Sequence, residues 1–151
     1  MNLLGIDFGT TSVKSVMFSE NFDEITSTLE DYTLNTQGDR VEFPSEQYFT
    51  LLINAIENAK KSATIDALAI DTQCETLILT DEEGNPVRDA IVWLDNRATA
   101  EAEVIEKQFG RKMVYEVTGQ PEITATWPAA KLLWVKNNEP EVWAKTKKIF
   151  L

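Results

Sequence analysis

Residues 3–18 read Leu-Leu-Gly-Ile-Asp-Phe-Gly-Thr-Thr-Ser-Val-Lys-Ser-Val-Met-Phe, and the fold is decided in this stretch. An apolar run ends at Asp7, a short polar segment rich in glycine and threonine follows, and apolar residues resume at Val13. Two apolar runs on either side of a short polar turn are typical of two strands joined by a tight hairpin. The sequence therefore predicts a β-hairpin with residues 9–12 at its tip.

The tip of this hairpin has the composition of an anion-binding loop. Gly9 permits close approach of the backbone to a ligand. The amides and hydroxyls of Thr10, Thr11 and Ser12 can all donate hydrogen bonds to an anion. We therefore predict that residues 9–12 form a cradle for phosphate groups.

Asp7 lies where the first strand ends, and its carboxylate would repel a bound phosphate. A Mg²⁺ ion held partly through water would remove that conflict, so we expect Asp7 to be a metal ligand. Lys14 begins the return strand, and its ammonium could reach a phosphate as a point charge. The alternative that so short a pattern leaves open is an ordinary hairpin with solvated polar residues.

The Asp-x-Gly-Thr-Thr pattern of residues 7–11 resembles the first phosphate loop of the superfamily that contains actin, the heat-shock chaperone ATPases, hexokinases and sugar kinases. In that superfamily the hairpin embraces the β- and γ-phosphates of ATP, and the aspartate organises the metal. The resemblance implies ATP and Mg²⁺ as cofactors. It also implies an α/β fold, a ribonuclease H-like (actin-like ATPase) domain with a mixed five-stranded sheet flanked by helices.

Composition excludes several classes of function. The net charge of −11 argues against non-specific binding to nucleic acid or to an anionic membrane, because both need a basic surface. No apolar run approaches the roughly 18 residues of a membrane span. With Cys74 alone and no histidine, the chain can form no internal disulfide, no cysteine metal cluster and no histidine-based triad.

The two ends of the chain led to two further expectations. No basic, apolar signal segment precedes Leu3, which predicts a cytoplasmic location. Residues 148–151 read as the beginning of an apolar strand, which a natural domain rarely leaves as its last element. The length of 151 residues suits one core. We therefore expect residues 1–151 to be a single, incomplete N-terminal domain.

The rest of the chain alternates between strand-like and helix-like patterns. Further strands are predicted at 24–34, 65–70, 77–79, 90–93 and 148–151, and helices at 46–60, 98–109, 112–117, 128–135 and from Pro140 onward. Residues 37–44 are expected to be a polar loop, and the acidic residues 81–86 a solvated turn. The core-facing stripe predicted for the first helix comprises Tyr48, Leu52, Ile56 and Ala59, widened by Phe49 and Ile53.

Two segments that follow predicted strands carry polar and aromatic side chains, at residues 71–76 and 93–97. A polyol or sugar needs acceptors for its hydroxyl protons, donors for its oxygens and a flat apolar surface for its carbon face. Glu75 and Asp95 can accept, Arg97 and Gln73 can donate, and Trp93 can stack. The alternative is that these residues form ordinary turns and that the tryptophan belongs to the core.

These segments resemble the carbohydrate kinases of the FGGY family. Residues 73–76, Gln-Cys-Glu-Thr, resemble the Gln-Arg-Glu-Thr of glycerol kinases and occupy the place of Gln-Met-His-Gly in xylulose kinases. Residues 93–97 match the Trp-x-Asp-x-Arg of the pentulose and gluconate branches. Residues 126–134 and 139–141 resemble the Pro-Lys-Leu-Leu-Trp and Glu-Pro-Glu of xylulose kinases. By this resemblance Cys74 and Glu75 take a substrate-contacting role.

The family resemblance implies transfer of the γ-phosphoryl group of ATP to a hydroxyl of a small sugar or polyol. Xylulose is the first expectation, and glycerol, erythritol and gluconate kinases are the alternatives, because Cys74 and Glu75 match neither the glycerol nor the xylulose pattern fully. The family's catalytic aspartate and its adenine-binding C-terminal domain are expected beyond Leu151. No base is therefore assigned to Asp71 or Asp95, and these 151 residues alone are expected to be inactive.

Three further possibilities stay open at this point. One is a non-catalytic nucleotide switch of the actin type, and a second is a fragment with only a binding role. The third concerns assembly, since a homodimer of the full enzyme is compatible with the resemblance.

Overall fold

The structure is a computed structural model that describes residues 1–151. The chain folds into two compact units: unit 1 comprises residues 1–34 and 45–73, and unit 2 comprises residues 35–44 and 74–151. Both units lie within the single domain predicted from the length, and that domain assignment stays a prediction.

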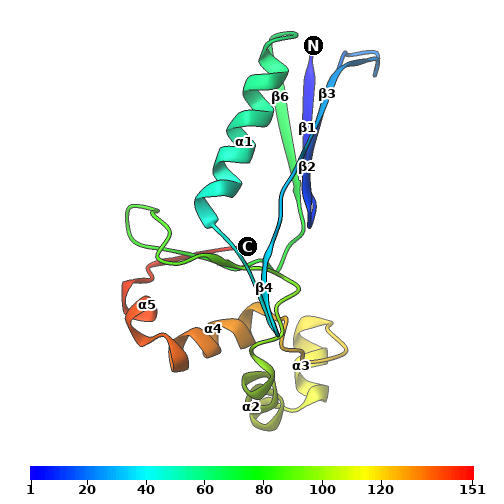
Figure 1. The fold of residues 1–151 in the computed structure, drawn as a ribbon. Helices are drawn as coiled ribbons and strands as arrows, with labels where there is room; N and C mark the ends of the chain where they lie inside the picture. The colour runs from blue at the N-terminus through cyan, green and yellow to red at the C-terminus, as the bar shows by residue number, and fades with distance from the viewer. The chain divides into compact units, whose positions relative to one another are not determined.

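Unit 1 is built on a four-stranded mixed sheet of order β3-β2-β1-β6 (Figure 1). Its strands are β1 (Leu3–Phe8), β2 (Ser12–Phe18), β3 (Glu24–Asp31) and β6 (Ala67–Thr72). The predicted hairpin pairs β1 with β2 in antiparallel register from Leu3–Phe18 to Phe8–Val13. β3 forms within the predicted strand 24–34 and is antiparallel to β2, whereas β6 is parallel to β1. Residues 9–12 therefore connect the last residue pair of the hairpin.

Helix α1 (Ser45–Lys60) packs on one face of this sheet (Figure 1). It buries Leu51, Ala55 and Ala59, and the alternating residues Leu4, Ile6 and Phe8 of β1 are buried as well. The predicted helix is confirmed, but its predicted stripe was partly wrong. Phe49 is 66% exposed and Ile53 is 42% exposed, because the buried stripe runs through positions 51, 55 and 59.

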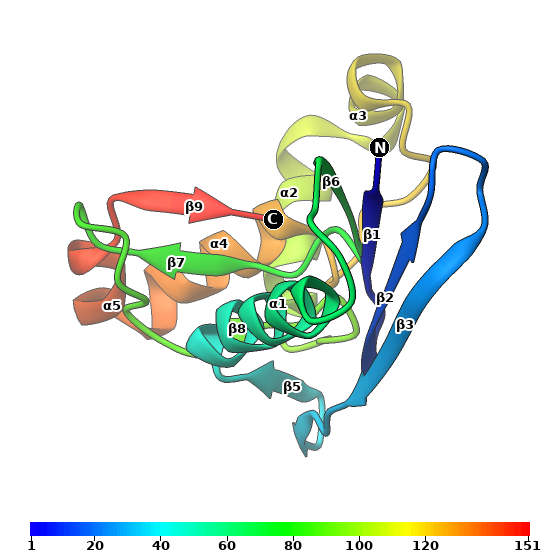
Figure 2. The same ribbon diagram turned by 90° about the horizontal axis from the view of Figure 1, so that it is seen from above.

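Unit 2 contains two small antiparallel sheets. One has the order β4-β5-β8, with β4 (Asn35–Gln37), β5 (Arg40–Phe43) and β8 (Ala90–Ile91). The other pairs β7 (Ile78–Thr80) with β9 (Lys148–Phe150), which lie side by side in Figure 2. The prediction of a polar loop at 37–44 was wrong. Gln37 pairs with Arg40 across a two-residue turn in which Gly38 has a φ of 59°, and such a turn joins two short strands.

Four helices complete unit 2, each at a place where the sequence predicts one. They are α2 (Thr99–Phe109), α3 (Arg111–Thr118), α4 (Pro128–Asn138) and α5 (Pro140–Lys145). α4 contributes Ala130, Trp134 and Val135 to a core that also contains Leu77, Leu79, Ile91, Ala98 and Ala102. Leu77 and Ile91 of this core lie within two residues of segments 74–76 and 93–97, which carry predicted sugar-binding residues.

The α/β class with a mixed sheet is confirmed, but the sheet has four strands where five were predicted. The reason is that the segments predicted at 77–79 and 90–93 do not join the hairpin's sheet. They pair instead with β9 and β5 inside unit 2. None of the helices combines the length and the apolar character that crossing a bilayer requires.

Candidate functional site

The tip of the β1–β2 hairpin is closed by its own backbone. The Gly9 N–H donates to the Ser12 carbonyl at 3.0 Å. A Cβ atom at residue 9 would lie 3.2 Å from that same carbonyl oxygen, which is tighter than an ordinary contact. Glycine at this position therefore keeps the turn narrow, and Thr11 is left exposed at the tip.

The side chains of Tyr32 and Gln73 stabilise the hairpin tip by hydrogen bonds to the Gly9 carbonyl. The Tyr32 hydroxyl donates to the Gly9 carbonyl, and the Gln73 side-chain amide donates to that carbonyl at 3.2 Å and to the Tyr32 hydroxyl at 3.3 Å. The Tyr32 backbone N–H also donates to the Thr11 carbonyl at 2.9 Å. Burial raises the pKa of Tyr32, so the phenol remains a neutral donor at physiological pH.

Gln73 was expected to donate to a sugar. In unit 1 its amide nitrogen instead contacts Gly9 and Tyr32, which makes it a support of the hairpin; direct contact with substrate stays a prediction. Tyr32 itself was not predicted. Tyr32 directly follows the third strand, and nothing in the sequence around it indicates that its hydroxyl reaches the hairpin tip.

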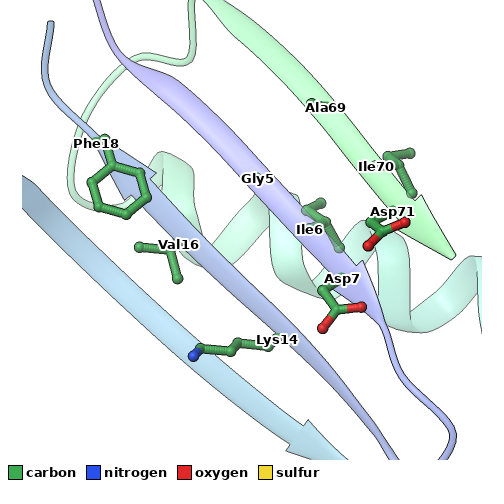
Figure 3. Close-up of a pocket in the computed structure, with 9 residues that line it drawn as sticks. All are labelled: Gly5, Ile6, Asp7, Lys14, Val16, Phe18, Ala69, Ile70 and Asp71. Carbon is green, nitrogen blue, oxygen red and sulfur yellow. The ribbon is translucent and has the colours of Figure 1, made fainter. Parts of the chain in front are cut away.

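A pocket of about 430 Å³ opens on the sheet face beside the hairpin (Figure 3). Asp7 and Asp71 lie on the adjacent parallel strands β1 and β6 in direct register, and Figure 3 shows their carboxylates next to each other. Lys14 lies opposite Asp7 in the β1–β2 register and also lines the pocket. Asp71 was not predicted as a site residue, and the equal position of the two aspartates near their strand ends is the signal that could have found it.

The carboxylates of this pocket are of the kind that bind a magnesium ion shared with phosphate groups. No cluster of three or more histidine, cysteine, aspartate or glutamate side chains that could hold a metal ion is present. Mg²⁺ usually keeps several waters and binds one or two carboxylates together with substrate phosphates. The exposed Asp7 carboxylate, two residues before the predicted phosphate cradle of residues 9–12, matches that ligand set.

In unit 2 the segment 74–76 has a strained backbone. Cys74 and Glu75 have φ values of 50° and 53°, in a region that side chains other than glycine rarely adopt. The Thr76 N–H donates to the Cys74 carbonyl at 2.6 Å and closes a three-residue turn around Glu75. Each such conformation costs on the order of 1–3 kcal/mol and persists only where its surroundings enforce it. Strain of this kind is concentrated at functional sites.

The second predicted segment lies beside this turn. The Trp93 N–H donates to the Thr76 hydroxyl at 3.2 Å, and Leu77 and Ile91 exchange two backbone hydrogen bonds at 2.8 and 3.0 Å. Cys74 is exposed, while Glu75 and Trp93 are half-buried. The structure therefore brings these three predicted sugar-binding residues together within unit 2.

Asp95 is fully buried, and its carboxylate is used inside the protein. It accepts from the Val41 amide at 2.6 Å and from Arg97 Nε and Nη2 at 2.9 and 2.7 Å. Burial opposes the charge of Arg97, but the hydrogen bonds that its guanidinium donates to Asp95 and Glu42, together with their negative charges, outweigh it and raise the pKa of Arg97. Direct contact of Asp95 with a sugar hydroxyl stays a prediction, and its observed contacts are those of a support.

Arg97 is surrounded on all sides. Its side chain is 3% exposed, pairs with Glu42 at 2.7 Å and lies 4.9 Å over the Trp134 ring. Glu42 also pairs with Arg88, which in turn pairs with Glu139 at 2.6 Å. Only Nη1 of Arg97 has no hydrogen-bond partner, and that atom is itself buried. Direct donation of a hydrogen bond from Arg97 to a sugar stays a prediction.

The fully buried Lys131 of α4 was missed by the sequence analysis. Its ammonium donates to the carbonyls of Glu75 at 2.7 Å and Val92 at 3.2 Å. Burial lowers its pKa to about 8, although the nearby Asp95 and Glu75 act in the opposite direction. A single lysine inside the apolar stretch of residues 129–135 is the signal that could have drawn attention to it.

Comparison with known proteins identifies the family. The model of the FGGY family of carbohydrate kinases, N-terminal domain, matches residues 2–151. The chain belongs to this family. The resemblance predicted from residues 73–76 and 93–97 is thereby confirmed at the level of the family.

Relatives of this FGGY domain act on several sugars. This chain is 33% identical to a gluconokinase of Bacillus subtilis (strain 168), in an alignment that covers 97% of this chain and 29% of the relative. It is 27% identical to a xylulose kinase of Lactococcus lactis, covering 99% of this chain and 30% of the relative. A solved ligand-bound xylulose kinase from Lactobacillus acidophilus superposes with a TM-score of 0.89 at 26% identity, covering 98% of this chain and 31% of that one. The FGGY domain thus spans about 30% of the relatives' length.

Substitution of Asp95 by alanine tests its role as a support. We expect Asp95→Ala to lower the free energy of unfolding by about 3–5 kcal/mol, because it leaves the buried Arg97 guanidinium without its main partner. Chemical denaturation monitored by tryptophan fluorescence measures this change. Asp89→Ala, at an exposed position six residues away, serves as the control and should change stability by less than about 0.5 kcal/mol. Equal effects of the two substitutions would contradict the assignment.

The depressed pKa of Lys131 predicts a pH dependence of stability. Between pH 8 and its ordinary value of 10.5 the folded state has released this proton and the unfolded state still holds it. The free energy of unfolding relative to Lys131→Met should therefore rise with pH across this window and stay level below it. Denaturant titrations of both proteins at intervals from pH 7 to about 10.5 measure the difference. A level or falling difference would show that Lys131 is not desolvated.

Proposed function

We propose that the protein takes part in the ATP-dependent phosphorylation of a hydroxyl group on a small sugar or polyol. The observation that carries this proposal is the narrow Gly9–Ser12 hairpin tip beside the Asp7 carboxylate, in a chain of a carbohydrate kinase family. Unit 2 adds a strained turn with polar and aromatic side chains, which suits recognition of a small hydroxylated molecule.

In unit 1 the roles concern the nucleotide. Residues 9–12 would form the phosphate cradle, with hydrogen bonds donated by residues 10–12 and close backbone approach permitted by Gly9, and Lys14 would offset the phosphate charge. Asp7 would hold Mg²⁺, which when bound neutralises charge that develops on the phosphoryl group. Tyr32 and Gln73 keep the hairpin in place through the Gly9 carbonyl. Positioning and charge neutralisation account for most catalysis of phosphoryl transfer.

In unit 2 the roles concern the sugar. Glu75 would accept hydrogen bonds from hydroxyl groups, Trp93 would stack on the carbon face, and Cys74 would contact the substrate beside them. Asp95 and Arg97 would fix the backbone from which Trp93 projects. No residue of this chain is assigned as the catalytic base, and the adenine pocket is proposed to belong to a further part of the whole protein.

For the substrate we propose a neutral pentulose such as xylulose. The reason is the half-buried Glu75 carboxylate, which accepts from hydroxyls and repels an anionic group placed next to it. Gluconate is the second candidate, since the Bacillus subtilis gluconokinase is 33% identical to this chain. Glycerol and erythritol are less well matched, because the arginine of the glycerol kinase pattern is replaced by Cys74.

A substrate panel tests the proposal. MgATP-dependent phosphorylation of xylulose, ribulose, gluconate, glycerol and erythritol would be measured with the full-length protein, with ADP release as the readout. We expect turnover of xylulose, and loss of at least about a hundredfold in kcat/KM in Asp7→Asn, because the metal ligand is weakened. Asp23→Asn, at an exposed turn of unit 1, is the matched control.

The other outcomes are equally informative. Turnover of gluconate in place of xylulose would reassign the substrate within the same reaction. Binding of MgATP without turnover of any compound would reject the kinase proposal and favour a nucleotide-binding role without catalysis.

A further inference from the structure

Lys131 connects the two segments of unit 2 that carry the candidate sugar-binding residues. It lies on α4 and is completely buried, yet its ammonium reaches out of the helix to two backbone carbonyls. One is the carbonyl of Glu75 itself, and the other is that of Val92, the residue before Trp93. The Lys131 side chain thus binds the backbone of both segments that carry candidate sugar-binding residues.

The first of these segments needs a restraint from outside. Cys74 and Glu75 are consecutive residues with positive φ, and neither is a glycine. The turn's own hydrogen bond, from the Thr76 N–H to the Cys74 carbonyl, spans only three residues. Without further contacts a chain with these side chains would relax toward negative φ. The hydrogen bond from Lys131 to the Glu75 carbonyl lies at the centre of this turn.

The residues that follow Glu75 are fixed by hydrogen bonds to the second segment. Leu77 is hydrogen-bonded to Ile91, and the Thr76 hydroxyl accepts from the Trp93 N–H. Lys131 adds a third point of attachment, between these pairs and the helix. This attachment restrains the backbone of Glu75 directly, and that of Trp93 through the preceding residue Val92.

We propose that Lys131 is a positioning residue that fixes the Cys74–Glu75 turn against the Trp93 segment and so aligns both for binding the sugar. This inference rests on the proposed function for its consequence in catalysis. Its structural part, the restraint of the turn, stands on the contacts alone. The competing explanation is that Lys131 only satisfies two buried carbonyls and contributes stability to unit 2 as a whole.

Hydrogen–deuterium exchange of Lys131→Met separates these explanations without any need for activity. Methionine keeps the length and the apolar stem but removes the donor. We expect the amides of segments 74–77 and 92–95 to exchange at least about tenfold faster, because local opening of the turn becomes easier. Segment 13–18 of unit 1 should be unchanged. Lys136→Met, on an exposed face of the same helix, is the control and should leave all segments unchanged.

A kinetic measurement on the full-length protein tests the consequence for the sugar. In Lys131→Met the KM for the sugar should rise about tenfold or more, with kcat changed less than about threefold and the KM for ATP unchanged. Lys131→Gln, which retains a side-chain donor, should give an intermediate effect. It also serves as the working variant if Lys131→Met does not fold.

Each result decides between the two explanations. Unchanged exchange in segments 74–77 and 92–95, or an equal increase along the whole chain, would overturn the positioning role. Selective loosening of the two segments in a protein that phosphorylates none of the sugars would uphold the restraint and reject the proposed function. Selective loosening with an unchanged KM for the sugar would show that the turn does not bind it.

Discussion

The organisation of unit 2 depends on the burial of charged groups. Asp95 and Lys131 are completely buried, and Arg97 is nearly so. A buried charge is tolerated only where hydrogen bonds and opposite charges compensate its lost hydration. The compensation here comes from the ion pair between Asp95 and Arg97 and from backbone groups that lie far apart in the sequence, the Val41 amide and the carbonyls of Glu75 and Val92. Satisfying these charges therefore fixes the segments on which the candidate sugar-binding residues lie.

Unit 1 uses the same principle with neutral groups. The carbonyl of Gly9 at the hairpin tip receives hydrogen bonds from the Tyr32 hydroxyl and the Gln73 amide, from two other strands' ends. These two donors restrain the backbone of the tip on which the proposed phosphate-binding amides and hydroxyls lie. A rigid loop binds an anion with less loss of conformational entropy than a mobile one. The support behind the hairpin is thus as much a part of the candidate site as the hairpin.

The sequence predicts local structure and the hairpin well, because the alternation in residues 3–18 and the helical spacing in 98–109 are local signals. It does not predict which strands share a sheet, since residues 77–79 and 90–93 pair with segments distant in the chain. The contacts of Gln73 and Asp95 could not be predicted for the same reason. A polar residue after a strand is easily interpreted as a ligand contact. Only the tertiary structure shows that Gln73 donates to the Gly9 carbonyl and that Asp95 accepts from the Val41 amide.

The most direct test of the hairpin's role is an NMR titration of the ¹⁵N-labelled protein with ATP, in the presence and absence of Mg²⁺. The amides of residues 9–12 should shift on addition of MgATP, with a smaller response to ATP alone, because Asp7 repels the phosphates when no cation lies between them. Binding of MgATP that shifts amides elsewhere and leaves residues 9–12 unchanged would contradict a phosphate-binding hairpin.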